Sequence, residues 1–151
     1  MKRAQRLDMV QRVVDDSERG RAQSLAASER RLKESETKLS ELRAYQDGYM
    51  REFSRRAGNG IDSASARDYQ AFLARLEEAL KQQTQAVTRA RAQRDAAMST
   101  WQGAALRAQA VGQMVKRFQT EQEQALDRRE QSESDERSQR AWIQGLIPRG
   151  A

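Results

Sequence analysis

The sequence predicts an all-α protein: a long antiparallel two-helix coiled-coil hairpin with an overhanging second helix. Three observations lead to this prediction. The composition favours long helices over a globular core, apolar residues recur about every 3.5 residues in two long segments, and a glycine-containing turn separates the segments. We predict one coiled-coil domain over residues 1–140 and a flexible, apolar-containing tail over residues 141–151.

The composition limits both the fold and the chemistry. The 151 residues are 37% apolar, 5% aromatic and 33% charged, which is too little apolar surface for a packed globular core. The absence of cysteine and histidine excludes disulfides, thiolate nucleophiles, zinc sites and imidazole acid–base chemistry. Acid pairs such as Asp15-Asp16 lie on predicted helix exteriors. We therefore expect a protein that is not an enzyme, with no catalytic residues, no metal and no cofactor.

The charge and hydropathy patterns bear on location and partners. No apolar run approaches the roughly 20 residues that span a bilayer, and the basic start at Lys2, Arg3 and Arg6 is followed by Asp8 rather than by a signal-peptide core. These features predict a cytosolic protein. The formal charge of +6 and the pI near 10.1 indicate an acidic partner, which can be nucleic acid, an anionic membrane surface or an acidic protein cavity.

Each predicted helix carries a narrow apolar stripe, which we call the coiled-coil seam. Alternate steps of three and four from Leu7 to Phe53 meet eight apolar residues in fourteen, and the same steps from Tyr69 to Phe118 meet thirteen in fifteen. This spacing predicts helices over about residues 3–56 and 63–140. The strongest seam positions are Leu32, Leu39, Leu42, Tyr49, Tyr69, Leu76, Leu80 and Val87.

The turn is predicted over about residues 57–62. Gly58-Asn59-Gly60 can supply the positive φ values that end a helix, and Asp62, Ser63 or Ser65 can cap the next one. If the helices fold back about Asn59, the numbers of facing seam residues add to about 118. Tyr49 with Tyr69, Leu42 with Leu76, Leu39 with Leu80, Leu32 with Val87 and Leu7 with Val111 all satisfy this condition.

The second helix is longer than the first, so its far part has no facing helix in this register. Residues 120–140 hold seven acids, four basic residues and one leucine, which fits either a solvated single helix or frayed coil. The apolar cluster from Trp142 to Pro148 then reads either as a disordered tail or as a short docking peptide.

Two surface features are candidates for partner binding. The open end of the hairpin brings the basic start of the chain beside Arg107, Lys116 and Arg117, although these residues can also simply solvate the coiled coil. Near the turn, Phe72, Leu76 and Ala79 form a row along one flank of the second helix. Phe72 either presents this row to a partner or folds over the first helix. Nucleic acid is not expected, because the aromatic residues that could stack bases occupy seam positions.

These residues resemble a known family. The stretch from Lys38 to Phe53, the Gly-Asn-Gly turn and the stretch from Arg67 to Leu76 are similar to the flagellar FliJ family. Tyr-x3-Tyr-x3-Phe before the turn and Tyr-x2-Phe-Leu-x2-Leu after it carry most of the resemblance, which extends over most of residues 1–140.

The resemblance implies a component of the flagellar type III export apparatus. Members form a coiled coil similar to the stalk of rotary ATPases, bind the hexameric export ATPase FliI, promote its assembly, contact the export gate protein FlhA and handle export chaperones. The resemblance places gate binding at Phe72, Leu76 and Ala79, and ATPase-ring binding at the basic end with Arg3, Arg6, Arg107, Lys116 and Arg117. It also implies a cytoplasmic protein held peripherally, through its partners, at the inner face of the membrane at the flagellar base.

Two alternatives stay open at this point. One is the equivalent stalk protein of an injectisome, which uses the same mechanism in another machine. The other is a basic coiled-coil scaffold that binds nucleic acid or anionic membrane.

Overall fold

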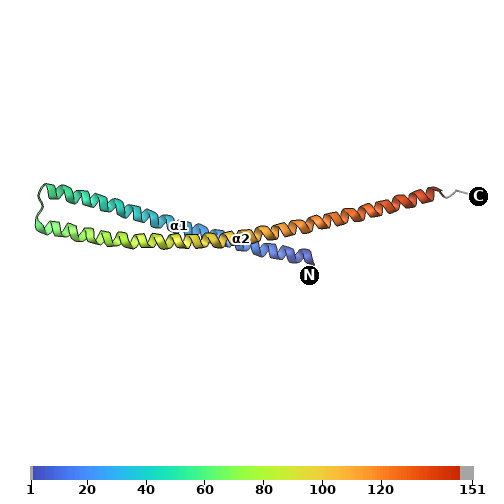
Figure 1. The fold of residues 1–151 in the computed structure, drawn as a ribbon, viewed down its shortest axis with the longest axis horizontal. Coiled ribbons are helices and arrows are strands. Elements are labelled where there is room, and N and C mark those ends of the chain that lie inside the picture. Colours follow the sequence, from blue (N-terminus) through green and yellow to red (C-terminus); the bar gives the residue numbers. More distant parts are fainter. Residues whose placement is uncertain (1, 147–151) are drawn as a thin grey trace, which may run out of the picture. The chain divides into compact units, whose positions relative to one another are not determined.

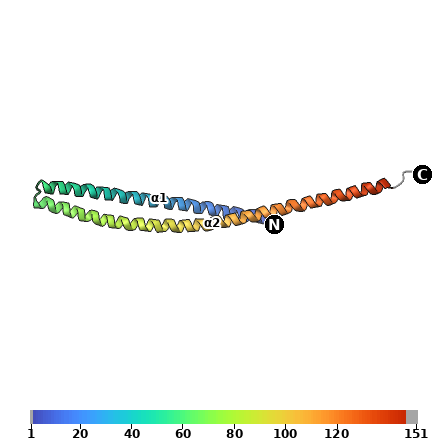
Figure 2. The ribbon, with the colours of Figure 1, turned by 45° about the horizontal axis from the view of Figure 1, so that its top comes forward.

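The computed structural model describes residues 2–146 and consists of two helices, α1 (Arg3–Gly58) and α2 (Ser63–Leu146). No strand occurs in these residues. In Figures 1 and 2 the chain turns back after α1, so that α2 runs antiparallel beside it. The all-α helical hairpin predicted from the sequence is confirmed.

The chain divides into two compact units, each containing a piece of both helices. The turn unit is Ser17–Ala105, and the end unit combines Met1–Asp16 with Leu106–Ala151. Each unit is described by itself below.

The turn is shorter than predicted and lies later in the sequence. The α1 helix continues to Gly58, and the Asn59 amide still donates to the Arg55 carbonyl. Among the described glycines only Gly60 has a positive φ, of 90°, and its amide donates to the Ala57 carbonyl at 3.4 Å. This is the way in which a left-handed residue commonly closes a helix. The α2 helix then begins at Ser63, after Asp62, whose carbonyl accepts the first helical bond from Ala66.

The core of the turn unit is thin. Leu32, Leu39, Val87 and Ala90 form a buried cluster, and Leu80 packs against it. Among the described residues no large side chain is fully buried, which is the expected consequence of packing only two helices together. The hairpin is therefore held by many modest contacts along its seam.

Contacts across the turn unit test the predicted register. The rings of Tyr49 and Tyr69 lie 5.1 Å apart, and the Gln83 side-chain amide donates to the Ser35 carbonyl at 3.0 Å. In both pairs the residue numbers add to 118. The predicted pairs Leu32–Val87 and Leu39–Leu80 also share one cluster. The antiparallel register is thus confirmed in this unit.

The end unit shows a small departure from that register. Leu7 lines a hollow together with Val115 and Phe118. Val115 lies one helical turn beyond Val111, the residue predicted to face Leu7.

Beyond this contact region α2 continues as a single helix. Every side chain from Gln119 to Leu146 is exposed. The helix runs to Leu146, so the predicted flexible tail from residue 141 starts too early. No strong helix breaker occurs between Arg140 and Gln144, whereas Pro148 disfavours helical geometry in the residue before it. The rest of the predicted tail, residues 147–151, lies outside the described residues.

Candidate partner-binding surfaces

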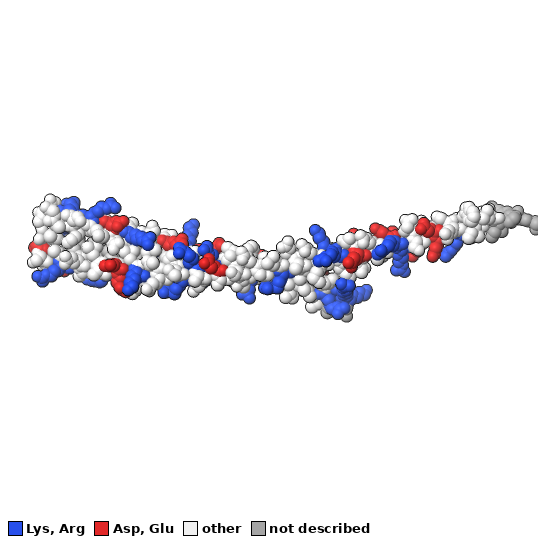
Figure 3. All heavy atoms as spheres, in the orientation of Figure 1, with Lys and Arg blue, Asp and Glu red and all other residues white. Residues whose placement is uncertain are grey.

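The first candidate surface is the basic end, where α1 begins beside α2. Figure 3 shows lysine and arginine side chains gathered around the start of α1. The residues singled out from the sequence all belong to the end unit and are all exposed: Arg3, Arg6, Arg107, Lys116 and Arg117. The five cations thus belong to one unit, although Arg3 and Arg117 are 114 positions apart in the sequence.

One of these arginines has a defined place. The guanidinium carbon of Arg3 lies 5.1 Å from the centre of the Phe118 ring, within the range of a cation–π contact. An exposed contact of this kind contributes about 0.5–1 kcal/mol. It joins the start of α1 to the last seam residue of α2 that is not fully exposed, so it helps to close the end of the hairpin.

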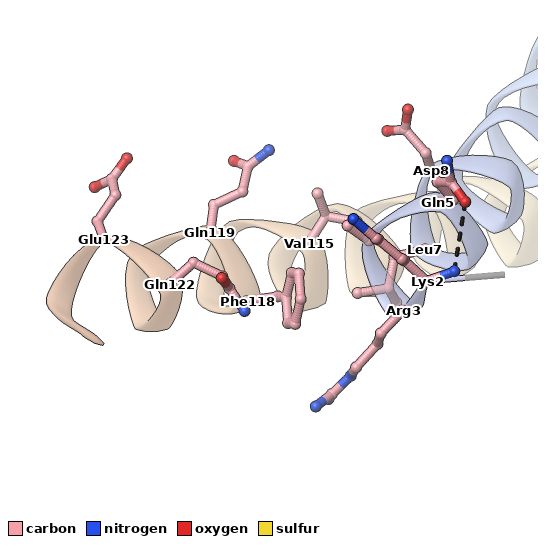
Figure 4. A pocket seen from close by; sticks show the side chains of 11 residues that line it. Lys2, Arg3, Gln5, Leu7, Asp8, Val115, Phe118, Gln119, Gln122 and Glu123 are labelled. Carbon is pink, nitrogen blue, oxygen red and sulfur yellow. Dashed lines mark hydrogen bonds between the residues drawn. The ribbon is translucent and has the colours of Figure 1, made fainter. Parts of the chain in front are cut away.

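A hollow of about 990 Å³ lies next to this contact. In Figure 4, Leu7, Val115 and Phe118 lie together as its apolar part, and Gln122 and Glu123 line it farther along α2. At the other side the backbone amide of Lys2 donates to the side-chain oxygen of Gln5 at 3.4 Å. The hollow has an apolar floor with cations and a few carboxylates at its edge, an arrangement suited to a protein side chain. Within the described residues no group of acidic side chains could hold a metal ion.

The second candidate surface is the row near the turn. Phe72 is half-buried, and its ring lies 4.4 Å from the ring of Tyr49 and 6.1 Å from that of Tyr45. Leu76 is only 7% exposed, and Ala79 is half-buried. Of the two alternatives left open by the sequence, the structure has Phe72 folded over α1.

Sequence reasoning missed one residue of this aromatic cluster. Tyr45 lies outside the seam, is 56% exposed and contacts Phe72 edge-on. The sequence does contain a signal for this contact, because Tyr45 and Phe72 each directly precede a seam position on their helix. A partner approaching the row meets the outer edges of Tyr45 and Phe72, with Ala79 beside them, rather than Leu76.

The eight seam residues chosen from the sequence lie between the helices. Leu32, Leu39, Leu76 and Val87 are buried, and the remaining four are half-buried: Leu42, Tyr49, Tyr69 and Leu80.

A charged group at the turn end of α1 is far from the basic end in sequence. Arg55 donates two hydrogen bonds to Glu52, of 2.7 and 3.1 Å, and Arg56 donates one of 3.1 Å. The hydrogen bonding of Arg55, followed by that of Arg56, lowers the pKa of the Glu52 carboxyl, and the same pairing raises the pKa of Arg55. These side chains are exposed, so the group has little weight in stability.

The structure shows no helix, within the described residues, that is long and apolar enough to cross a membrane. The sequence was also compared with known proteins. The family model described as "Flagellar FliJ protein" matches residues 1–146. A curated "Flagellar FliJ protein" of Salmonella typhi is 31% identical over 134 residues, which cover 89% of this chain and 88% of that protein. No solved structure matches the chain. The match over nearly the whole helical hairpin shows that the chain belongs to the FliJ family, whose members are components of the flagellar export apparatus.

Proposed function

We propose that this protein is the non-enzymatic stalk of the flagellar export ATPase. In this proposal the coiled coil binds the hexameric ATPase, FliI, and promotes ring assembly and hydrolysis. It also links the ring to the export gate protein FlhA and to export chaperones. The protein would then be cytoplasmic and held at the inner face of the membrane, at the flagellar base, through its partners.

The observation that carries the proposal is the exposed basic end. Arg3 and Arg6 from α1 and Arg107, Lys116 and Arg117 from α2 belong to one unit, beside an apolar hollow. A protein that inserts between ring subunits needs a narrow, exposed surface that can be held from several sides. A pair of helices provides that surface at a width of about 20 Å, since each helix is about 10 Å across with its side chains.

The row near the turn supports the proposed link to the gate. Phe72 and Ala79 keep part of their surface exposed, although Leu76 is buried in the seam. In this proposal the partner contacts the outer aromatic edge, and Leu76 acts by holding Phe72 in place.

The test of the proposed function is the rate of ATP hydrolysis by the purified cognate FliI with and without this protein. Stimulation that falls with rising salt concentration would support a contact made by the basic end. The variant Arg3→Glu/Arg6→Glu/Lys116→Glu should lose most of this stimulation at low salt.

A matched control reverses three exposed arginines in the turn unit: Arg43→Glu/Arg67→Glu/Arg75→Glu. This control changes the net charge equally and should keep the stimulation. If the wild-type protein leaves hydrolysis unchanged at every salt concentration, the proposal is wrong. Equal losses in the two triple variants would show that only the net charge matters.

A further inference from the structure

The two sides of the coiled coil can be told apart by their contacts in the turn unit. Tyr45 and Phe72, whose rings lie 6.1 Å apart, each directly precede a seam residue. Glu36 and Arg91, which form an ion pair of 3.4 Å across the helices, each directly follow one. Residues that precede seam positions therefore share one flank of the hairpin, and residues that follow them share the other. The same seam spacing continues in the end unit, and one further step of three before Leu7 adds Ala4 to the seam.

This rule divides the end unit into two unlike flanks. The flank of preceding residues, which we call the apolar–arginine flank, consists of Arg3, Arg6, Val10, Val13, Arg107, Ala110, Met114 and Arg117. The flank of following residues consists of Gln5, Asp8, Arg12, Asp15, Gln109, Gly112, Lys116 and Gln119. The first flank has four arginines and no acid. The second has two acids and two cations, so its formal charge is zero.

The apolar side chains follow the same division. Val10, Val13 and Met114 are exposed on the apolar–arginine flank, whereas Met9 and Leu106 are exposed on the outer face, midway between the two flanks. Val13 and Leu106 are each 67% exposed. The opposite flank has no large apolar side chain at all. Exposed apolar residues gathered on one side and bordered by charge are typical of an interaction surface.

The composition of this flank favours a protein partner over a lipid surface. Protein interfaces are enriched in arginine and methionine and depleted in lysine. The flank contains four arginines and one methionine, Met114, whereas the one lysine of α2 in this region, Lys116, lies on the other side. Guanidinium groups also match carboxylates through paired hydrogen bonds. The complementary surface is therefore apolar at its centre and carries carboxylates at its edge.

We propose that the ATPase ring is contacted by the apolar–arginine flank alone, and not by the basic end as a whole. This inference rests on the proposed function and restricts the proposed contact surface to one flank. Val10, Val13 and Met114 become contact residues, whereas Lys116 is not one. The stalk would hold the ring from one side, against a wall with apolar and acidic side chains.

The experiment measures the Kd of the complex between the full-length protein and purified FliI, by surface plasmon resonance at constant salt. The double variant Val13→Gln/Met114→Gln should raise Kd by roughly tenfold or more, because it removes two exposed apolar contacts. Its matched control, Met50→Gln/Leu126→Gln, changes two exposed apolar residues elsewhere and should leave Kd within about twofold. Far-UV circular dichroism checks that both variants remain helical, as expected because glutamine is a good helix former.

A second pair of variants separates the inference from the proposed function. Arg107→Gln should weaken binding several-fold, whereas Lys116→Gln should leave Kd within about twofold. If FliI binds but Val13→Gln/Met114→Gln leaves Kd unchanged, or if Lys116→Gln weakens binding as much as Arg107→Gln, the one-sided contact is wrong and the proposed function stands. If the wild-type protein does not bind FliI, both are wrong. Binding to phosphatidylglycerol vesicles is the last measurement. If the vesicles bind through Val13 and Met114 while FliI binding does not depend on these residues, the flank is a lipid surface and the inference is overturned.

Discussion

The indole N–H of Trp101 donates a hydrogen bond of 2.9 Å to the carboxylate of Glu18, although the two residues are 83 positions apart in the chain. Both residues occupy seam positions and both are half-buried. A large aromatic ring and a carboxylate thus share one layer of the seam, because the ring carries a donor at its edge. This pair fixes the register of the two helices at a point where the seam is otherwise made of small or polar side chains.

Removing the donor should destabilise the hairpin. Trp101→Phe should lower the free energy of unfolding by about 1 kcal/mol, since a hydrogen bond to a charged group contributes about 1.5–3 kcal/mol when buried and less at this half-exposed site. Urea unfolding followed by circular dichroism measures the effect. A double-mutant cycle with Glu18→Ala, which removes the acceptor, separates the bond from the loss of ring area, and additive effects in that cycle would contradict a direct interaction.

The turn depends on a single glycine in the left-handed region. Gly60→Ala should lower the free energy of unfolding by about 1–2 kcal/mol, because an alanine pays a steric penalty at a φ of 90° even though the space around Gly60 is open. Gly48→Ala is the matched control: it lies inside α1, also faces open space and should raise stability by about 0.5–1 kcal/mol. Thermal melting of the two variants should therefore shift in opposite directions, and a shared direction would contradict this view of the turn.

The seam explains why so much of the fold could be predicted from the sequence. A spacing of about 3.5 residues is a local property of each helix, and the condition that facing residues add to one number joins the two helices without further information. The position of the turn was less certain, because Gly58, Asn59 and Gly60 can all adopt left-handed geometry. Of the two glycines, only Gly60 does so.

The candidate surfaces were harder to predict, for a different reason. Whether Phe72 is exposed depends on the distance between the helices and on the side chain opposite, and the seam spacing contains neither. In the structure the ring of Phe72 lies 4.4 Å from that of Tyr49 and 6.1 Å from that of Tyr45. At the open end, charge alone placed Arg3 and Lys116 in one predicted binding surface, although the two residues lie on opposite flanks. The difference between the flanks becomes visible only when exposed apolar residues such as Val13 are considered with the charges.

The charged group at the end of α1 gives a prediction about pH. The pKa of Glu52 is lowered, first by the hydrogen bonds from Arg55, so the folded protein favours the charged carboxylate. The small stabilisation it gives is present above the ordinary pKa of glutamate and disappears as the pH falls through the lowered value. Carbon-detected NMR titration should show a midpoint for Glu52 below the ordinary pKa of glutamate. In Arg55→Gln that midpoint should rise, and an unchanged midpoint would show that Arg55 is not the cause.

Phe72 provides the last prediction, because it lies both in a stabilising cluster and in the row proposed to contact the gate. Phe72→Ala should lower the free energy of unfolding by about 2 kcal/mol, less than the 3–5 kcal/mol typical of a fully buried phenylalanine, since the ring is half-exposed but loses its contacts with Tyr49 and Tyr45. Urea unfolding measures this loss.

A second variant separates the two roles of Phe72. Leu39→Ala removes a buried seam side chain outside the row and should destabilise the hairpin by a similar or larger amount. Both variants are then compared for binding to the purified cytoplasmic domain of FlhA, at a temperature at which circular dichroism shows both to be folded. If Phe72 contacts the gate, Phe72→Ala should weaken binding at least about tenfold, as expected for a lost aromatic contact, while Leu39→Ala leaves it nearly unchanged. Equal weakening by the two variants would mean that Phe72 acts only by stabilising the hairpin, and gate binding would then have to be sought at other exposed side chains.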